Sequence, residues 1–328
     1  MTQSYILLTI IIALNLFFLM NLDRLNNIFN FYDYPIKKRK IHKVKTSLLG
    51  GSIFFISLNI YFLFDYFYFK NFINFSYISL LLSFGIIFII GIIDDKKDIK
   101  AFIKSTFFVL IILISISPNE NLIIRDLKFS FFKNEINLNN YSYLFTILCI
   151  YLFINSFNMY DGINGQAGLY IIIIFSYLFY KGILNEMSLL FLICAIFFLY
   201  LNLKNKIFLG DNGSLLISFL ISLVVIKSYN ENLINYCDEI FILMMLPGID
   251  MARLFIERIS KKKNPLIADG NHFHHILLKR YKLNYVLLIN LILILTPILA
   301  LLIGISSFKI IVSFLLIYFF ILIKLRTS

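Results

Sequence analysis

The segment Gly91–Ile99, GIIDDKKDI, ends a long apolar run in three aspartates, Asp94, Asp95 and Asp98. A carboxylate at the centre of a membrane-spanning helix costs about 2.5 to 3.5 kcal/mol on insertion scales. The aspartates are therefore expected at the edge of a membrane, where they pair with cations or bind a metal. The alternative is that they form only the acidic cap of the next helix. This segment alone does not decide between the two.

The composition of the whole chain indicates a membrane protein. Of 328 residues, 60% are hydrophobic and only 15% are charged, and no soluble core of this size could bury such an apolar excess. Apolar runs of about 17 to 25 residues cross a bilayer as helices. We therefore predict an all-α polytopic membrane protein, a single domain over residues 1–328, with about eleven spans at 4–20, 48–64, 77–93, 102–117, 142–157, 167–180, 187–203, 213–228, 238–252, 286–303 and 309–323.

The basic residues predict the orientation. On one side of the alternating loops lie 23 of the 30 Lys and Arg residues. By the positive-inside rule this side is cytoplasmic, which places the N-terminus outside and the C-terminus inside. The first apolar run has no basic start and no cleavage site of small residues, so we expect a retained helix there rather than a signal peptide.

The net charge of +12 also bears on partners. The basic residues are dispersed over short loops, which argues against nucleic acid and favours membrane lipids or a phosphorylated substrate. The three cysteines, Cys149, Cys194 and Cys237, are odd in number and scattered, so no disulfide framework is expected. The oligomeric state stays open, a homodimer being one alternative.

Two loops on the predicted cytoplasmic side combine carboxylates with cations. The first carries a basic run up to Lys45 and then Gly50–Gly51; it is either a topology anchor or an electropositive rim for phosphates. The second holds the three aspartates and then Lys104. Carboxylate oxygens suit Mg²⁺. Adjacent aspartates point about 100° apart on a helix, so one could bind metal while the other does something else.

Two further helix ends on that side carry polar residues. Asn155, Asn158 and Asp161 recur at a spacing of three, which puts amides and a carboxylate on one side of a helix end. These groups suit a nucleobase or ribose, although the segment could merely join two helices. Asp211 stands between glycines in FLGDNGS, Phe208–Ser214, where capping alone could explain it. Their repetition on one face favours a site.

The last large loop holds His272, His274 and His275. Without cysteines nearby or a helical pair at i and i+4, this cluster is a poor zinc site. Imidazoles near Arg253 and Arg258 are better suited to donate to phosphate and sugar oxygens, the alternative being a solvated basic loop. On the opposite side, the segment 118–140 alternates polar and apolar residues and predicts a small hairpin, with a structural role as a lid.

Five separated motifs together resemble the polyprenyl-phosphate N-acetylhexosamine-1-phosphate transferases of glycosyltransferase family 4. They are RKxH…GG at Arg39–Gly51, DDxxD at Asp94–Asp98, NxxNxxDG at Asn155–Gly162, FxGDxGS at Phe208–Ser214 and HxHH at His272–His275. The motifs lie between residues 33 and 280, and the family's eleven-helix topology agrees with the predicted spans. Departures are Asn164 and Gln166 where the family usually has Asp and Leu, and Ser47 where it has Pro.

The resemblance implies an activity. The HxHH loop, with Pro247–Asp250 and Asp269, looks like the branch that transfers a phospho-N-acetylhexosamine from its UDP derivative, most often UDP-N-acetylglucosamine, to undecaprenyl phosphate in the bacterial plasma membrane. UMP is released and assembly of a surface glycan, such as O-antigen or teichoic acid, begins. The implied cofactor is Mg²⁺, with Mn²⁺ as an alternative. Two other readings stay open: a phospho-N-acetylmuramoyl-pentapeptide transferase, and a transporter of nucleotide-sugars or other anions.

The resemblance also implies roles for individual residues. Asp95 and Asp211 are expected to hold the metal, and Asp94 to orient or deprotonate the lipid phosphate, although Asp94 and Asp95 could exchange roles. The substrate-binding residues are expected on three sides: Asn155, Asn158 and Asp161 toward uridine, Arg258, His272, His274 and His275 toward the pyrophosphate or sugar, and Lys45 and Lys104 toward phosphates. The identity of the sugar is not predicted, because it depends on a few hydrogen bonds.

Overall fold

The computed structural model describes residues 2–33, 45–264 and 270–327, and α-helices make up most of them. The helices are α1 (Thr2–Phe29), α2 (Gly50–Phe64), α3 (Tyr77–Lys96), α4 (Ala101–Ile116), α5 (Ser142–Tyr160), α6 (Gln166–Tyr180), α7 (Asn185–Leu203), α8 (Gly210–Asn230), α9 (Cys237–Ser260), α10 (Phe273–Leu278), α11 (Leu283–Leu302) and α12 (Ser307–Thr327). Two short antiparallel hairpins pair β1 (Tyr32–Asp33) with β2 (Thr46–Ser47) and β3 (Asp126–Phe129) with β4 (Phe132–Asn137).

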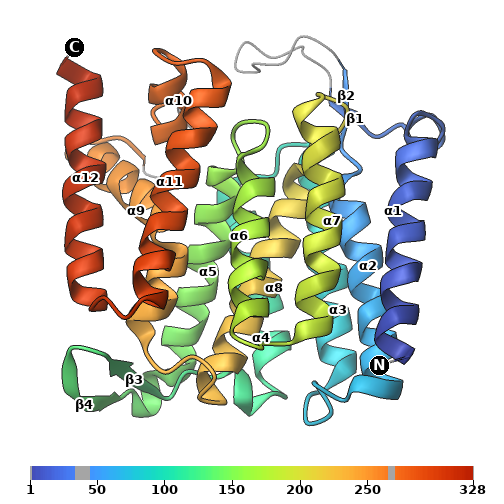
Figure 1. The fold of residues 1–328 in the computed structure, drawn as a ribbon, viewed down its shortest axis with the longest axis horizontal. Coiled ribbons are helices and arrows are strands. Elements are labelled where there is room, and N and C mark those ends of the chain that lie inside the picture. Colours follow the sequence, from blue (N-terminus) through green and yellow to red (C-terminus); the bar gives the residue numbers. More distant parts are fainter. Residues whose placement is uncertain (1, 34–44, 265–269, 328) are drawn as a thin grey trace.

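The all-α multi-pass class is confirmed, and each of the eleven predicted spans coincides with a helix. Within the described residues, eight helices have the length and composition to cross a membrane, and α4 and α6 are apolar but shorter. The charged helix α9, which also contains Pro247, meets neither description. The short helix α10 was not predicted. The number of crossings and their orientation stay predictions, although α1 begins and α12 ends at opposite ends of the bundle (Figure 1).

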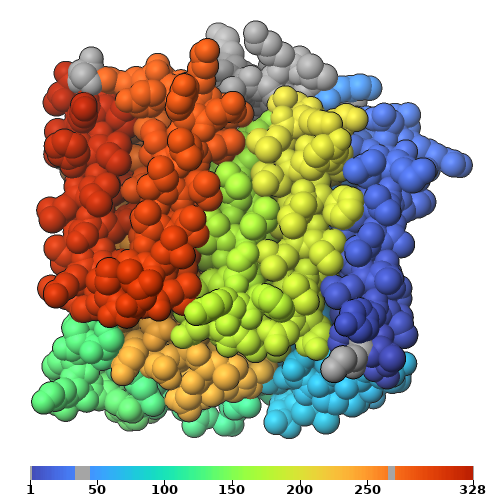
Figure 2. Space-filling model, viewed as in Figure 1, coloured from blue at the N-terminus to red at the C-terminus, as the bar shows by residue number. Residues whose placement is uncertain are grey.

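Helix α8 is the centre of the bundle. Every residue from Asn212 to Tyr229 is buried, because α2, α3 and α5 pack around this helix. Figure 2 shows one face of the molecule, which is covered by α1, α6, α7, α11 and α12. The burial of α8 on all sides leaves this helix no face toward lipid or water. The polar N-terminal turn of α8, which holds Asp211, is therefore surrounded by the ends of other helices.

Glycines set how closely those helices approach α8. A Cβ built on Gly91 of α3 would lie 2.3 Å from the Cα of Asn212, and one built on Gly51 of α2 would lie 1.8 Å from the Oδ1 of Asn212. Gly85, two turns earlier on α3, has open space instead. The absent side chains of Gly51 and Gly91 thus allow α2 and α3 to contact the first turn of α8. This contact brings the end of α3 against the start of α8.

The predicted hairpin within 118–140 is confirmed by β3 and β4, which lie at the end of the bundle opposite α10 (Figure 1). Asp238, in the first turn of α9, accepts hydrogen bonds from the backbone nitrogen and the hydroxyl of Ser130 in the turn of the hairpin. The hydroxyl of Tyr229 donates to the carbonyl oxygen of Asp126. The hairpin is therefore anchored to α8 and α9, and its role as a lid stays a prediction.

Candidate functional site

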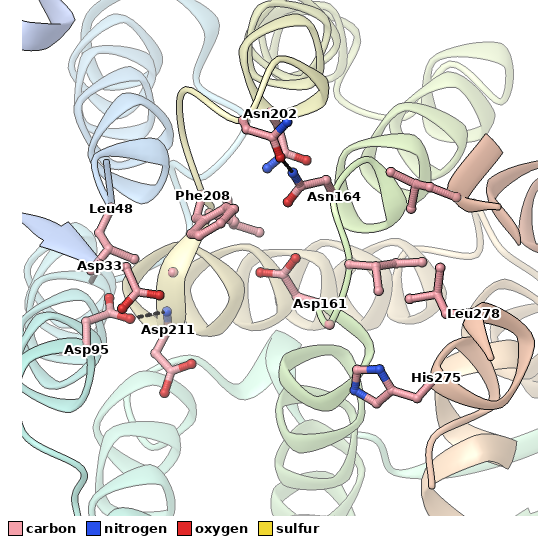
Figure 3. A pocket seen from close by; sticks show the side chains of 16 residues that line it. Asp33, Leu48, Asp95, Asp161, Asn164, Asn202, Phe208, Asp211, His275 and Leu278 are labelled. Atoms are coloured by element: carbon pink, nitrogen blue, oxygen red, sulfur yellow. Dashed lines mark hydrogen bonds between the residues drawn. The ribbon is translucent and has the colours of Figure 1, made fainter. Parts of the chain in front are cut away.

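A cavity of about 480 Å³ lies at the end of the bundle where α3 ends and α8 begins. Figure 3 shows its lining, in which aspartates come from different elements of the fold. Four carboxylates contribute, Asp33, Asp95, Asp161 and Asp211, while no Lys or Arg is found among the described lining residues. Because carboxylates brought close together in a partly enclosed space repel each other, this carboxylate cavity is suited to a bound cation.

Asp95 fixes the start of α8 from the neighbouring helix. Its Oδ1 accepts from the backbone nitrogen of Asp211 at 2.8 Å, and its Oδ2 accepts from the backbone nitrogen and side-chain amide of Asn212 at 3.1 and 2.6 Å. The N-cap residue of α8 itself, Leu209, provides no side-chain bond. Asp95 therefore satisfies free N–H groups of the first turn, a task usually done by the helix's own cap.

Asp94 and Asp211 face the same ammonium group. Lys104 on α4 donates to the Oδ2 of Asp94 at 2.5 Å and to the Oδ2 of Asp211 at 3.0 Å. The Oδ1 of Asp94 accepts from the backbone nitrogen of Ile99, and the Oδ1 of Asp211 accepts from the amide of Asn158 at 2.8 Å. Asp211 is thus held by side chains of α4 and α5 and is not a cap of its own helix. Lys104 balances two carboxylates.

Asn155, Asn158 and Asp161 were predicted to point to a common space at the end of α5, but in the structure they have different surroundings. Asp161, the C-cap residue of α5, lines the carboxylate cavity, and Asn158 reaches Asp211 and Ser214. Asn155 donates to the carbonyl oxygen of Tyr151 within its own helix. Burial raises the pKa of Asp161 to about 7, and the charges of Asp211 and Asp95 add to the rise. A cation in the cavity would reverse this effect.

The three histidines have different surroundings. His275 lines the carboxylate cavity. His272 is buried, with its Nδ1 3.0 Å from the Oδ2 of Asp250. His274 is also buried, and its Nδ1 lies 3.3 Å from the side-chain nitrogen of Gln166. Burial lowers the pKa of His274 well below its usual range, and His275 and His272 lower it further, so this ring is neutral.

A buried network behind the histidines links α9, α10 and α12. The Oδ1 of Asp250 accepts from the guanidinium of Arg253, the hydroxyl of Tyr318 and the backbone nitrogen of Phe273. Arg253 also donates to the carbonyl oxygen of Asn271. This network fixes the start of the HxHH segment, at Asn271, His272 and Phe273, so His272 supports the loop, whereas His275 lines the cavity. Tyr318 was not predicted, because it lies in an apolar helix far from any motif.

The remaining predicted residues lie elsewhere. Arg258 is buried near the end of α9 and is absent from the described lining of the carboxylate cavity. Lys45 lines a second cavity, described below. Asp98 follows the end of α3, and the N-cap residue of α4 is Lys100. Asp269 lies outside the described residues.

The comparison with known proteins covers the centre of this site. The sequence model of glycosyl transferase family 4 matches residues 77–229. We refer to these matched residues as the family segment. The family segment contains Lys104 and Asn158, whose side chains bind the carboxylate of Asp211. The match of the sequence model confirms the resemblance inferred from the motifs. The HxHH loop and Lys45 lie outside the matched residues.

Curated relatives support the assignment of the family segment. The chain is 27% identical to an undecaprenyl-phosphate alpha-N-acetylglucosaminyl 1-phosphate transferase of Yersinia pestis over 208 residues, 60% of this chain and 56% of that protein. It is 27% identical to a relative of the same name in Salmonella typhi over 256 residues, 74% and 67% of the two chains. A probable undecaprenyl-phosphate N-acetylglucosaminyl 1-phosphate transferase of Bacillus subtilis is 27% identical over 203 residues, 58% and 55%. The match thus spans little more than half the length of the first of these relatives.

Several residues that line the carboxylate cavity were not predicted to belong to the site. Asn202 accepts from the backbone nitrogen of Gly165 and donates to the carbonyl oxygen of Ile207, so it braces two loops at once. Asn164, noted only as a departure from the family pattern, donates to Asn205 at 2.6 Å. Asp33 lies in β1, and its position at the start of the basic loop, before the first motif, was the one available signal.

Proposed function

We propose that this protein transfers phospho-N-acetylglucosamine from its UDP derivative to undecaprenyl phosphate. A phosphate oxygen of the lipid would form a bond to the β-phosphorus of the UDP-sugar, the bond from that phosphorus to the bridging oxygen would break, and UMP would leave. The observation that carries the proposal is the carboxylate cavity, where Asp95, Asp161 and Asp211 come together inside the family 4 segment. The names of the relatives support the choice of substrates.

The residues around the cavity fit a magnesium ion. The donors are carboxylate oxygens, which Mg²⁺ prefers. Burial raises the pKa of Asp161, and the charges of Asp211 and Asp95 add to the rise, so a cation bound beside these groups would favour the charged carboxylate. Within the described residues, no group of three His, Cys, Asp or Glu side chains forms a complete metal site. Mg²⁺ commonly retains several water ligands and binds one or two protein carboxylates together with substrate phosphates. Asp95 and Asp211 would therefore suffice as its protein ligands. Mn²⁺ is a chemically similar alternative.

The bound metal would supply charge neutralisation for the pyrophosphate. The protein's own groups would do the positioning. Lys104 holds Asp94 and Asp211 in one orientation, and Asn158 fixes the other oxygen of Asp211. Asp94, beside this lysine, would orient the lipid phosphate. Asp161 and Asn164 would face the nucleoside, and His275 would donate to a phosphate or sugar oxygen from the far wall.

The location of the cavity completes the proposal. It lies at the end of the bundle that carries most of the basic loops, which the positive-inside rule assigns to the cytoplasm. UDP-sugars are made in the cytoplasm, and the lipid phosphate lies at the membrane surface. The proposed reaction therefore takes place at the cytoplasmic face of the bacterial plasma membrane, where the new lipid-linked sugar starts a surface glycan.

The purified full-length protein, given undecaprenyl phosphate and Mg²⁺, is expected to release UMP from UDP-N-acetylglucosamine. A panel with UDP-N-acetylgalactosamine, the 6-deoxy donors and UDP-N-acetylmuramoyl-pentapeptide tests the sugar. Chelation by EDTA should stop UMP release, and added Mg²⁺ should restore it. Release only from the pentapeptide donor would favour the peptidoglycan reaction. Counterflow of a nucleotide-sugar in proteoliposomes without any UMP would favour transport and refute the transferase.

Gly162→Ala is expected to lower UMP release at least tenfold. A Cβ at this position would lie 2.2 Å from the Nε2 of His274, so the ring and its neighbour His275 must move; a displacement of about 1 Å at a catalytic site can cost 10²-fold in rate. Steady-state kinetics measure the loss. Gly248→Ala, where a Cβ has open space, is the matched control and should keep the wild-type rate. Equal rates for both variants would show that His274 does not position the site.

A further inference from the structure

A second cavity, of about 690 Å³, lies between the end of α1, the β1–β2 hairpin and the loop from α7 to α8. Its charges are the opposite of those in the carboxylate cavity. Three lysines line it, Lys45, Lys204 and Lys206, against one described carboxylate, Asp23. We name it the lysine cavity. The two cavities adjoin, since Asn205 lines both.

The ammonium groups of the lysine cavity are not neutralised. In the described part of the chain, none of the three lysines forms an ion pair with a carboxylate. Two are held by aromatic rings instead: the Nζ of Lys45 lies 4.7 Å from the ring centre of Tyr32, and the Nζ of Lys204 lies 4.0 Å from that of Tyr200. Such contacts position an ammonium group without cancelling its charge for a ligand. The cavity therefore attracts anions.

One wall of the lysine cavity is apolar and continues onto the surface of α1. Leu19 and Met20 line the cavity, and the side chain of Met20 is 80% exposed. One turn earlier, Leu16 and Phe17 are also exposed and lie on the same face of the helix as Met20. An apolar strip thus leads from the lysines along α1, which is long and apolar enough to cross the membrane. A ligand suited to this cavity carries an anionic head and apolar chains.

We propose that the lysine cavity binds the headgroup of an anionic phospholipid, with its acyl chains along the exposed strip of α1. The phosphodiester would accept hydrogen bonds from Lys45, Lys204 and Lys206. Basic pockets between the ends of membrane helices are suited to such headgroups. The bound lipid would contact the α7–α8 loop, whose other side lines the carboxylate cavity. The lipid is a structural partner and not the sugar acceptor.

Native mass spectrometry of the delipidated full-length protein tests this proposal, with phosphatidylglycerol and phosphatidylcholine titrated separately. The wild-type protein is expected to retain phosphatidylglycerol about tenfold or more better than phosphatidylcholine, because each lysine near an anionic headgroup contributes about 1 kcal/mol. The triple variant Lys45→Gln, Lys204→Gln, Lys206→Gln should lose this preference. The matched control changes Lys261, Lys262 and Lys263 to Gln, which removes the same charge from exposed positions after α9, and should keep it.

Three outcomes would overturn the proposal. The first is that the triple variant and the control retain phosphatidylglycerol equally. The second is that millimolar inorganic phosphate displaces the lipid. The third is that a polyprenyl monophosphate binds preferentially at the same lysines. If the triple variant does not fold, the single variant Lys206→Gln decides, since this exposed side chain has no ion pair in the described residues. It should lower retention about fivefold. The measurement uses no sugar donor, so its result is independent of the proposed transferase activity.

Discussion

Asp211→Asn is expected to lower UMP release by about 10³-fold or more, the largest effect of any single change in the site. Asp211 is the one carboxylate that both lines the cavity and shares Lys104 with Asp94. Asparagine keeps the volume but removes the charge that a metal requires. It also leaves Lys104 with a single anionic partner. The kcat of the purified variant with saturating Mg²⁺ measures the effect.

The fold should survive this change. The backbone N–H of Asp211 still donates to Asp95, and its side chain caps no helix, so the melting temperature should fall less than in a variant that loses a cap. Asp95→Asn should differ, because its carboxylate caps α8 and the loss of a cap costs about 0.5–2 kcal/mol; that variant should lose both activity and stability. Asp126→Asn, the same chemical change in the hairpin at the far end, is the control. Wild-type turnover by Asp211→Asn would remove the metal role from this residue.

Gly91→Ala is expected to destabilise the protein and to lower UMP release about 10²-fold or more. Its Cβ would lie 2.3 Å from the Cα and 2.5 Å from the backbone nitrogen of Asn212. The backbone of α8 cannot yield as a flexible side chain would, so α3 must move away. Asp95 would then lose its short hydrogen bonds to the first turn of α8. Both the carboxylate of Asp95, which is proposed to hold the metal, and the packing of the central helix are affected.

The matched control for this prediction lies on the same helix. Gly85 has open space where its Cβ would be, and alanine is a better helix former than glycine by about 1 kcal/mol. Gly85→Ala should therefore keep the wild-type activity and a melting temperature at or above that of the wild type. Thermal unfolding in detergent and UMP release, measured side by side, compare the two variants. Similar behaviour of both would show that contact between α3 and α8 does not depend on Gly91.

Much of the fold could be predicted from local patterns. The apolar runs located the helices, since each run must satisfy its backbone hydrogen bonds within itself in a membrane. The polar residues at the ends of those runs located the site, because carboxylates are costly within the bilayer. Alternation in the segment 118–140 was enough to predict the hairpin. These signals are contained within single segments, so they can be read without knowing the neighbours.

The pairing of the charged groups could not be predicted in this way. Lys104 was expected to face phosphates, but it lies between Asp94 and Asp211, which are brought together from distant segments. The three histidines were treated as one cluster, whereas Asp250 and Gln166 hold two of them and leave His275 at the cavity. Spacing along the chain gives the direction of a side chain on its helix but not the partner that it meets.

The sequence by itself determined that this chain is a helical membrane protein in which separate helix ends, beginning with GIIDDKKDI, carry aspartates predicted to lie on one face. The tertiary structure alone decided what Asp94 and Asp95 of that segment contact. Asp95 caps α8 and Asp94 pairs with Lys104 because Gly51 and Gly91 let α2 and α3 contact the first turn of the buried central helix. That contact depends on the shapes of three helices at once, and no pattern within one segment encodes it.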